Sequence, residues 1–295
     1  MAVSTAGLPA RIRFGQALKE ARLAARKPDG EPVLQADASR ALRRKSIDRV
    51  SRLELGKAWP QPKELETLLD LYGVSLERRI AFQTMVSEGK ALARDAWWKE
   101  FEGEFATSLV EFLALEDSAT GITTCAGGII PGLLQTADYA RTLTGYLTRS
   151  AVTQRGLERA VELRTSRRRL LERTSPPEIE AVIGQGALEQ QVGGSGVMAA
   201  QLGSLLNDAA TYGITLRVIP FAANATIPFP LNYFEFGDDE DPIFAFDAVT
   251  GVMFRKTAKE VRGLKDFLAD LRELALSPED SIEAITSIQK EMSRD

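Results

Sequence analysis

The side chains best suited to bind a polyanion are concentrated between positions 35 and 57. The candidates are Gln35, Arg43, Arg44, Lys45, Ser46, Asp48, Arg49, Arg52 and Lys57. Arg49 and Arg52 can each donate paired hydrogen bonds to N7 and O6 of a guanine. The cations at 43–45 suit phosphates, and Ser46 can cap a helix whose free N–H groups favour phosphate binding. This segment is therefore predicted to contact double-stranded DNA.

Two features of the segment have more than one interpretation. Asp48 can accept a hydrogen bond from cytosine N4, or it can stabilise the start of a helix and hold Arg52 by an i, i+4 pair. We favour the second role. The basic side chains can also form a solvated face that has no nucleic-acid partner.

The composition excludes several classes of catalytic and metal site. The 295 residues contain no histidine and one cysteine, Cys125. Histidine-dependent nucleophilic catalysis and zinc sites with Cys or His ligands are therefore excluded, and one cysteine allows no intrachain disulfide. The glycine-rich segment 192–196 lacks the Lys-Ser/Thr ending of a phosphate-binding loop. We expect no enzymatic activity, no cofactor and no metal.

Charge is distributed unevenly along the chain. The formal net charge is −4, but residues 1–62 carry 13 Lys/Arg against 6 Asp/Glu, a net of +7, and the remainder carries a net of −11. Such an asymmetry suggests that residues 1–62 bind a polyanion, whereas the remainder of the chain has a different function.

Short helices are predicted to position the basic side chains. The apolar residues of the first helix recur on one face, at Phe14, Leu18, Ala21 and Ala25. Two prolines and a glycine break this helix at 27–32. Further helices are predicted at 34–42, at 46–55 and after 59–62. In the helix at 46–55, Val50 and Leu53 lie one turn apart and can face the core, which leaves the basic face open.

The whole chain is predicted to be mainly α, with an all-α N-terminal helix-turn-helix domain and an α+β C-terminal domain. The predicted segments are a flexible arm at 1–10, the DNA-binding domain at 11–75, a helical connector at 76–115, the α+β effector or partner domain at 116–280 and a helical tail at 281–295. The predicted strands are 121–126, 179–183, 214–219, 231–236 and 243–246. The predicted helices between them are 134–147, 153–173, 195–212 and 256–275.

Membrane and export signals are not expected. No run of about 18 apolar residues occurs, and the first ten residues lack the charged start and apolar stretch of a signal peptide. We therefore expect a cytoplasmic protein, and the predicted DNA binding would associate it with the nucleoid.

The segment 51–56, Ser51-Arg52-Leu53-Glu54-Leu55-Gly56, resembles the pattern S-R-[IL]-E-x-G that ends the third helix of XRE-family helix-turn-helix regulators. Pro60 and residues 65–74 fit the fourth helix of that family. The family has a small residue in its second helix, and Ser39 stands near that position. It also has a glycine in the turn, and Arg44 stands near that position. The connection at 27–33 is longer than usual. The resemblance implies a head whose third helix enters the major groove.

A second resemblance covers the C-terminal part. The segment 130–141 resembles the PGLLQT-x-x-YAR signature of the domain that accompanies XRE heads in actinomycete regulators of the Scr-type antitoxin-like and WhiJ-like kinds. Its residues alone indicate a rigid turn and a helix with a structural role. At 184–188 the chain lacks the acidic residue that this family usually has. The resemblance implies a domain that receives a signal or binds a small protein encoded by a neighbouring gene, without enzymatic activity.

Five residues are candidates for the partner or effector surface. They are Pro131, Gln135, Tyr139, Arg164 and Arg168. Arg164 and Arg168 lie one turn apart on a predicted helix, where they can dock an acidic partner or belong to a solvated, salt-bridged face.

These observations together predict a sequence-specific, repressor-like transcriptional regulator that binds two-fold sites as a homodimer. The alternative is an antitoxin-like module that mainly sequesters a small partner protein, with DNA binding secondary.

Overall fold

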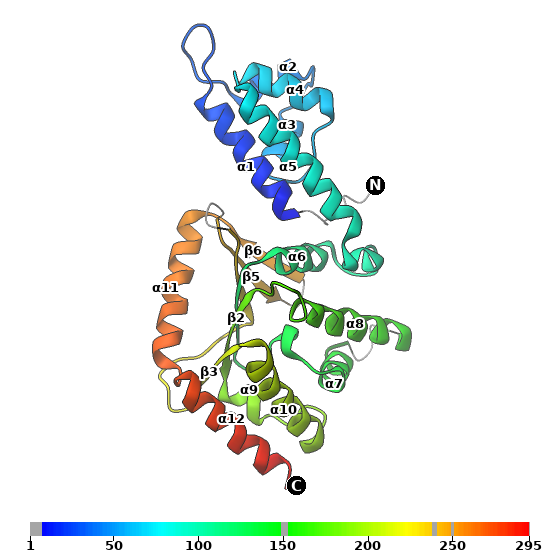
Figure 1. Cartoon of the computed structure of the whole chain (residues 1–295), viewed down its shortest axis with the longest axis vertical. Coiled ribbons are helices and arrows are strands. Elements are labelled where there is room, and N and C mark those ends of the chain that lie inside the picture. Colours follow the sequence, from blue (N-terminus) through cyan, green and yellow to red (C-terminus); the bar gives the residue numbers. More distant parts are fainter. Residues whose placement is uncertain (1–7, 149–152, 238–240, 249–250, 295) are drawn as a thin grey trace. The chain divides into compact units, whose positions relative to one another are not determined.

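A computed structural model describes residues 8–148, 153–237, 241–248 and 251–294 of the chain (Figure 1). The chain forms two compact units, which divide between Leu115 and Glu116. Most of the arm expected at 1–10 lies outside the described residues, and the first helix begins at Leu8. Within the described ranges, no helix combines the length and the apolar character needed to cross a membrane.

Helices build the N-terminal unit. They are α1 (Leu8–Ala24), α2 (Gln35–Ala41), α3 (Asp48–Glu54), α4 (Pro62–Leu71), α5 (Leu76–Asp95), the 3-10 helix η1 (Trp97–Phe101) and α6 (Thr107–Ser118), which crosses the boundary. The apolar residues predicted for the first helix are all buried, and so are Val50 and Leu53 of α3. The core of this unit therefore lies between α1 and the short helices that follow it.

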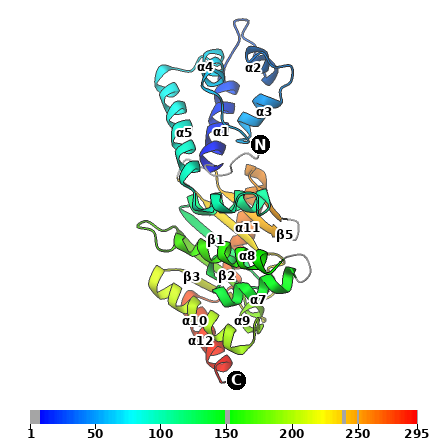
Figure 2. The same cartoon turned by 90° about the vertical axis from the view of Figure 1, so that its right-hand side faces the viewer.

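Helix α5 belongs to this core, although the sequence predicts a connector from residue 76. Phe82 of α5 is 3% exposed and meets the Phe14 ring edge-on at 5.8 Å. A Cβ atom at Gly89 would lie 2.4 Å from the Trp59 ring, so the absence of a side chain at Gly89 lets α5 approach that indole. Helix α5 consequently runs alongside α1 (Figure 2).

The C-terminal unit is organised by one six-stranded sheet. Its strands are β1 (Gly121–Ala126), β2 (Glu178–Gly184), β3 (Thr215–Ile219), β4 (Leu231–Glu235), β5 (Ile243–Ala248) and β6 (Gly251–Arg255). The strand order is β3-β2-β1-β4-β5-β6. The first three strands in the chain pair in parallel, and β4, β5 and β6 continue the sheet in antiparallel pairs.

The prediction of a mainly α protein was wrong. Helices make up 58% of the structure, but the six-stranded mixed sheet makes this a mixed α/β protein. Strand β6, with the sequence Gly-Val-Met-Phe-Arg, was not among the predicted strands. The parallel pairing of β1, β2 and β3 requires crossover connections, and helices supply them. Helices and parallel strands therefore alternate in the first part of this unit.

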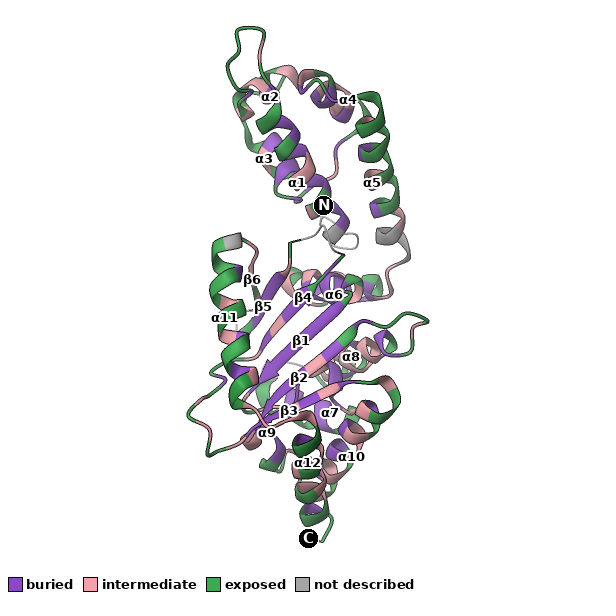
Figure 3. Cartoon of the chain, turned by 60° about the vertical axis from the view of Figure 1, so that its left-hand side comes forward, coloured by how far each residue is buried: buried purple, intermediate pink, exposed green. Residues whose placement is uncertain are grey.

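Helices cover both faces of the sheet (Figures 1 and 3). The helices of this unit that follow α6 are the 3-10 helix η2 (Gly132–Leu134), α7 (Ala137–Thr148), α8 (Gln154–Ser166), the 3-10 helix η3 (Arg167–Leu170), α9 (Gln185–Glu189), α10 (Ser195–Tyr212), α11 (Ala258–Leu274) and α12 (Pro278–Met292). Helix α11 packs on the face that carries Cys125, through Leu268 and Leu271. Burial raises the pKa of the Cys125 thiol to about 12.

Helix α12 closes the β3 edge of the sheet and is part of the fold, whereas the sequence predicts a tail from residue 281. The Val218 N–H donates to Ser281 Oγ at 3.0 Å, and the Leu276 N–H donates to the Val218 carbonyl at 2.9 Å. Ile285 and Met292 of α12 are buried. The apolar stripe of this helix therefore needs the sheet and α10 as partners.

We predict that Gly15→Ala destabilises the N-terminal unit. A Cβ atom at Gly15 would lie 2.6 Å from the Glu54 carbonyl oxygen and 2.8 Å from the Gly56 nitrogen, so α1 and α3 would have to separate. The expected loss in the free energy of unfolding is about 1–3 kcal/mol, measured by urea denaturation. Gly263→Ala is the control, because this helical glycine faces open space. There we expect a gain of about 0.5–1 kcal/mol. Equal effects at both positions would contradict the close packing of α1 against α3.

Candidate nucleic-acid interface

Helices α2 and α3 form a helix-turn-helix whose turn is fixed by hydrogen bonds. The Arg44 N–H donates to the Ser39 carbonyl at 2.9 Å, and the Ser39 hydroxyl donates back to the Ser46 carbonyl. Ser46 Oγ in turn accepts the Asp48 N–H at 3.0 Å, at the first residue of α3. The buried Ser39 therefore ties both ends of the turn together. The N-cap of α3 is Ile47, not Ser46 as predicted, and Ser46 lies one residue earlier, where its hydroxyl accepts the N–H of the first helical residue.

Arg43 is the residue in the left-handed backbone conformation of the turn. Its φ is +55°, the only positive φ of a non-glycine residue in the described part of the chain. The resemblance to the XRE pattern led us to expect the turn glycine near Arg44, one residue later. The side chain of Arg43 is exposed, so an arginine occupies a backbone position that favours glycine.

Helix α3 is held from behind by a buried ion pair. Arg22 of α1 donates to both carboxylate oxygens of Glu54, at 2.6 and 3.0 Å, and also to the Val33 carbonyl at 3.2 Å. The hydrogen bond to Glu54 raises the pKa of Arg22. Gln35, predicted to contact DNA, instead donates its side-chain amide to Glu54 at 2.8 Å. Its position at the start of α2 makes it a second support for α3.

Arg49, predicted to read guanine, is also engaged within the protein. Its guanidinium donates to both oxygens of Glu64, at 3.1 and 2.5 Å, and to the Trp59 carbonyl at 3.1 Å. The Arg49 side chain is 23% exposed. Hydrogen bonding from Arg49 lowers the pKa of Glu64 to about 2. Arg49 therefore links α3 to α4, and its donors are not available to a base in this structure.

The outward surface of α3 and its flanks carries the remaining predicted cations. Those that make no side-chain hydrogen bond or ion pair within the described ranges are Arg43, Lys45, Arg52 and Lys57, and all four are exposed. Arg44 is exposed and reaches Glu64 at 3.3 Å. We call these five residues the basic surface. Asp48 shares the outer face of α3 with Arg52, but no ion pair joins them in the described structure.

The basic surface has the geometry that direct readout requires. Val50 and Leu53 of α3 are fully buried in the core, whereas Arg52 is exposed. Helix α3 accordingly has both buried and exposed residues (Figure 3). A recognition helix must be fixed from behind while long donors reach the base edges. The structure therefore leaves Arg52 and the cations of the turn exposed, whereas Gln35 and Arg49 donate to carboxylates of the protein, Glu54 and Glu64.

The predicted partner residues of the C-terminal unit lie in an internal polar network. The Ile130 N–H donates to the Tyr139 hydroxyl at 3.0 Å, and Gln135 donates to the Ile130 carbonyl at 2.7 Å. Arg164 donates to the side-chain oxygen of Gln135 at 3.0 Å. Burial lowers the pKa of Arg164 and raises that of Tyr139. Pro131 is also buried, so this segment acts as a rigid turn.

Arg168 does not present a free guanidinium to a partner. It forms a two-hydrogen-bond pair with Asp208 of α10, at 2.7 and 2.8 Å, and the Asp208 side chain is 1% exposed. Its neighbour Arg167 pairs in the same way with Glu116 at 2.6 and 2.8 Å. These arginines therefore join helices of the C-terminal unit, and the docking patch expected at Arg164 and Arg168 is not formed at its surface.

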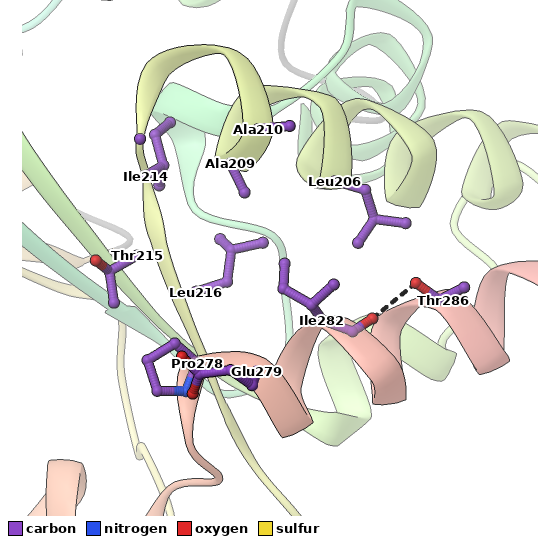
Figure 4. A pocket seen from close by; sticks show the side chains of 11 residues that line it. Leu206, Ala209, Ala210, Ile214, Thr215, Leu216, Pro278, Glu279, Ile282 and Thr286 are labelled. Atoms are coloured by element: carbon purple, nitrogen blue, oxygen red, sulfur yellow. Dashed lines mark hydrogen bonds between the residues drawn. The ribbon is translucent and has the colours of Figure 1, made fainter.

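The C-terminal unit has an apolar hollow of about 500 Å³ between α10, β3 and α12 (Figure 4). Its lining includes Leu206, Ala209, Ile214, Leu216 and Ile282, with the Thr286 hydroxyl bonded to the Ile282 carbonyl at 2.7 Å. The volume is in the range of small-molecule sites. Helix α10 therefore has two groups of apolar residues: Met198, Leu202 and Leu205 are buried in the core, and Leu206, Ala209 and Ala210 line this hollow.

Two acidic residues hold α3 in place, and the sequence patterns assigned this role to neither Glu54 nor Glu64. Glu64 follows Gln61 by three residues and accepts its N–H at 3.0 Å, which is the spacing of a helix capping box. That spacing is a sequence signal for the role of Glu64 at the start of α4. Glu54 belongs to the pattern at 51–56, but that pattern does not indicate its partner, Arg22, which lies 32 residues away.

Comparison with known proteins gives one match. The protein-family model described as "Domain of unknown function (DUF5753)" matches residues 109–287, more than half of the chain. No curated protein and no solved structure matches the chain.

We predict that Arg43→Gly stabilises the N-terminal unit. Glycine removes the steric cost of a positive φ, about 1–2 kcal/mol, and this outweighs its greater freedom in the unfolded chain. The expected net gain is about 0.5–1 kcal/mol in thermal or urea unfolding. Arg44→Gly is the matched control, since it removes the same charge at an ordinary φ. It should destabilise the unit by about 0.5–1 kcal/mol. The same sign for both variants would refute the assignment of the strained position.

We predict that Glu64→Gln destabilises the protein at neutral pH by about 1–3 kcal/mol, because Arg49 loses its charged acceptor. The lowered pKa of Glu64 stabilises the folded state above its ordinary value of 4.5, and this contribution is lost as the pH falls toward about 2. The stability difference between wild type and variant should therefore shrink across that window.

Glu66→Gln serves as the control in the same pH series. Glu66 is 46% exposed and pairs with Arg79 at 3.6 Å, so its removal should change stability by less than about 1 kcal/mol. A wild-type advantage over Glu64→Gln that persists unchanged at pH 2 would contradict the charge pairing of Glu64.

Proposed function

We propose that this chain, which belongs to the family described as "Domain of unknown function (DUF5753)", is a sequence-specific, repressor-like DNA-binding regulator. The observation that carries the proposal is the basic surface of the N-terminal unit. It combines a helix anchored by Val50 and Leu53 with exposed cations that have no carboxylate partner in the described structure, apart from Arg44.

In this proposal α3 enters the major groove and Arg52 makes the main base contact. The Arg52 guanidinium can bind guanine through paired hydrogen bonds. Of the two arginines expected to read guanine, Arg49 is hydrogen-bonded to Glu64, so Arg52 is the reader in this proposal. Arg43, Lys45 and Lys57 contact phosphates on either side of the groove and fix the position of the helix. Asp48 lies at the first turn of α3, where its carboxylate favours the helix start.

The proposal includes a homodimer on a two-fold operator and a regulatory input through the C-terminal unit. Helix-turn-helix proteins read half-sites one helical turn apart as dimers. The apolar hollow bounded by α10, β3 and α12 offers a place for a small apolar effector. A small protein encoded by a neighbouring gene is the other candidate input. Action on DNA places the protein in the cytoplasm, at the nucleoid.

The charge distribution supports a strongly salt-dependent complex. Residues 1–62 carry a net charge of +7, and the rest of the chain carries −11. The acidic part adds repulsion from DNA, so the affinity depends on the few cations of the basic surface. Each phosphate contact releases counterions, and the affinity should fall steeply as salt rises.

The decisive experiment is the selection of bound sites from random double-stranded DNA with the full chain, followed by affinity measurements on the enriched site. We predict that Arg52→Ala weakens binding by about 1–3 kcal/mol and relaxes the preference at one base pair of each half-site. Arg78→Ala is the matched control, because Arg78 is an exposed arginine on α5, away from α3. It should leave both affinity and preference unchanged.

Other outcomes lead to different conclusions. Equal losses for Arg52→Ala and Arg78→Ala would show that charge alone drives binding, and would remove the assignment of Arg52. The absence of any enriched site, together with a small protein co-purifying in stoichiometric amount, would replace the proposal by the antitoxin-like alternative.

A further inference from the structure

An aliphatic side chain stands exposed at the entrance to the proposed recognition helix. Ile47 is the residue directly before α3, and 49% of it is accessible to solvent. Its backbone carbonyl accepts the Ser51 N–H at 2.9 Å, which fixes the main chain at this point. The side chain is not part of the core that contains Val50 and Leu53. Ile47 is therefore held in place by its backbone while its side chain faces outward.

We propose that Ile47 reads the C5-methyl group of a thymine in each operator half-site. The inference rests on the proposed function and adds a base preference to it. In the major groove the thymine methyl is the apolar group that separates this base from cytosine, and an aliphatic side chain is the natural contact for it. Burying both groups against each other removes apolar surface from water.

The local structure suits Ile47 for this role. Isoleucine is β-branched, so its side chain loses little freedom on binding and presents its methyl groups in a defined direction. Lys45 and Ser46 precede it and can bind phosphates beside the groove. Recognition helices contact bases mainly from their N-terminal residues, where Ile47 lies.

Two other exposed leucines near the basic surface fit this role less well. Leu55 is 59% exposed but follows the last residue of α3, at the end of the helix away from its first turn. Leu34 is 55% exposed and precedes α2, the helix that crosses the DNA backbone in this motif. Of these three exposed aliphatic residues, Ile47 is therefore the one whose position in the motif suits contact with a base.

The test replaces single thymines by deoxyuridine in the operator obtained from site selection. This change removes one methyl group and leaves every hydrogen-bonding atom in place. For the wild-type protein, one thymine per half-site should show a loss of about 3- to 5-fold in affinity when replaced, as expected for one methyl group. Replacement of the other thymines should have little effect.

The Ile47→Ala variant should bind the thymine operator several-fold more weakly than wild type and should show no further loss with deoxyuridine at the sensitive position. Ile80→Ala is the matched control, because Ile80 is 57% exposed on α5. It should keep the wild-type affinity and the wild-type sensitivity. Thermal unfolding of both variants verifies that they are folded.

The outcomes separate this inference from the proposed function. A wild-type protein that binds a selected operator but tolerates deoxyuridine at every thymine overturns the role of Ile47 and leaves DNA binding intact. Retained sensitivity in Ile47→Ala assigns the methyl contact to another residue and likewise overturns it. Failure to select any operator overturns the proposed function itself, and the inference with it.

Discussion

The buried pair between Arg22 and Glu54 determines how the N-terminal unit presents α3. Its side chains are 8% and 3% exposed, so each charge depends on the other for its hydrogen bonds. Removal of one partner of such a pair typically costs about 3–5 kcal/mol, although replacing both by apolar residues is often neutral. The main consequence is geometric, because Arg22 also binds the Val33 carbonyl and Gln35 binds Glu54. The Glu54 carboxylate thereby fixes the position of α3 relative to α1 and α2.

Sequence patterns predicted the positions of helices and strands better than the way in which the strands pair into a sheet. The spacing of Phe14, Leu18 and Ala21 gave the first helix, and five strands were placed close to their observed positions. Strand β6 was missed because its five residues do not alternate between buried and exposed positions: four are partly buried and Met253 is exposed. The mixed sheet, which overturned the mainly α prediction, depends on pairing between distant segments. No local periodicity encodes that pairing.

In the candidate site too, local sequence patterns predicted some features, whereas others depend on contacts between residues far apart in the chain. Residue types and helical spacing identified the cations at 43–45 and Arg52, and the structure leaves these exposed. The same reasoning could not tell that Arg49 faces Glu64, because the i, i+3 spacing from Arg52 gives both arginines a similar place on the helix. The distinction comes from α4, which lies beyond a proline-rich connection. Carboxylates brought in by other helices therefore decide which arginines remain available.

The single cysteine gives the C-terminal unit its own chemical reporter. Cys125 lies on a central strand beneath α11, has no exposed surface, and has a thiol whose pKa is raised to about 12. A thiol in this state does not react with alkylating reagents until the surrounding structure opens. The rate of alkylation in native conditions therefore measures the opening of one unit alone, since the other contains no cysteine. Binding of an effector to the folded sheet would be visible as slower labelling at this one atom.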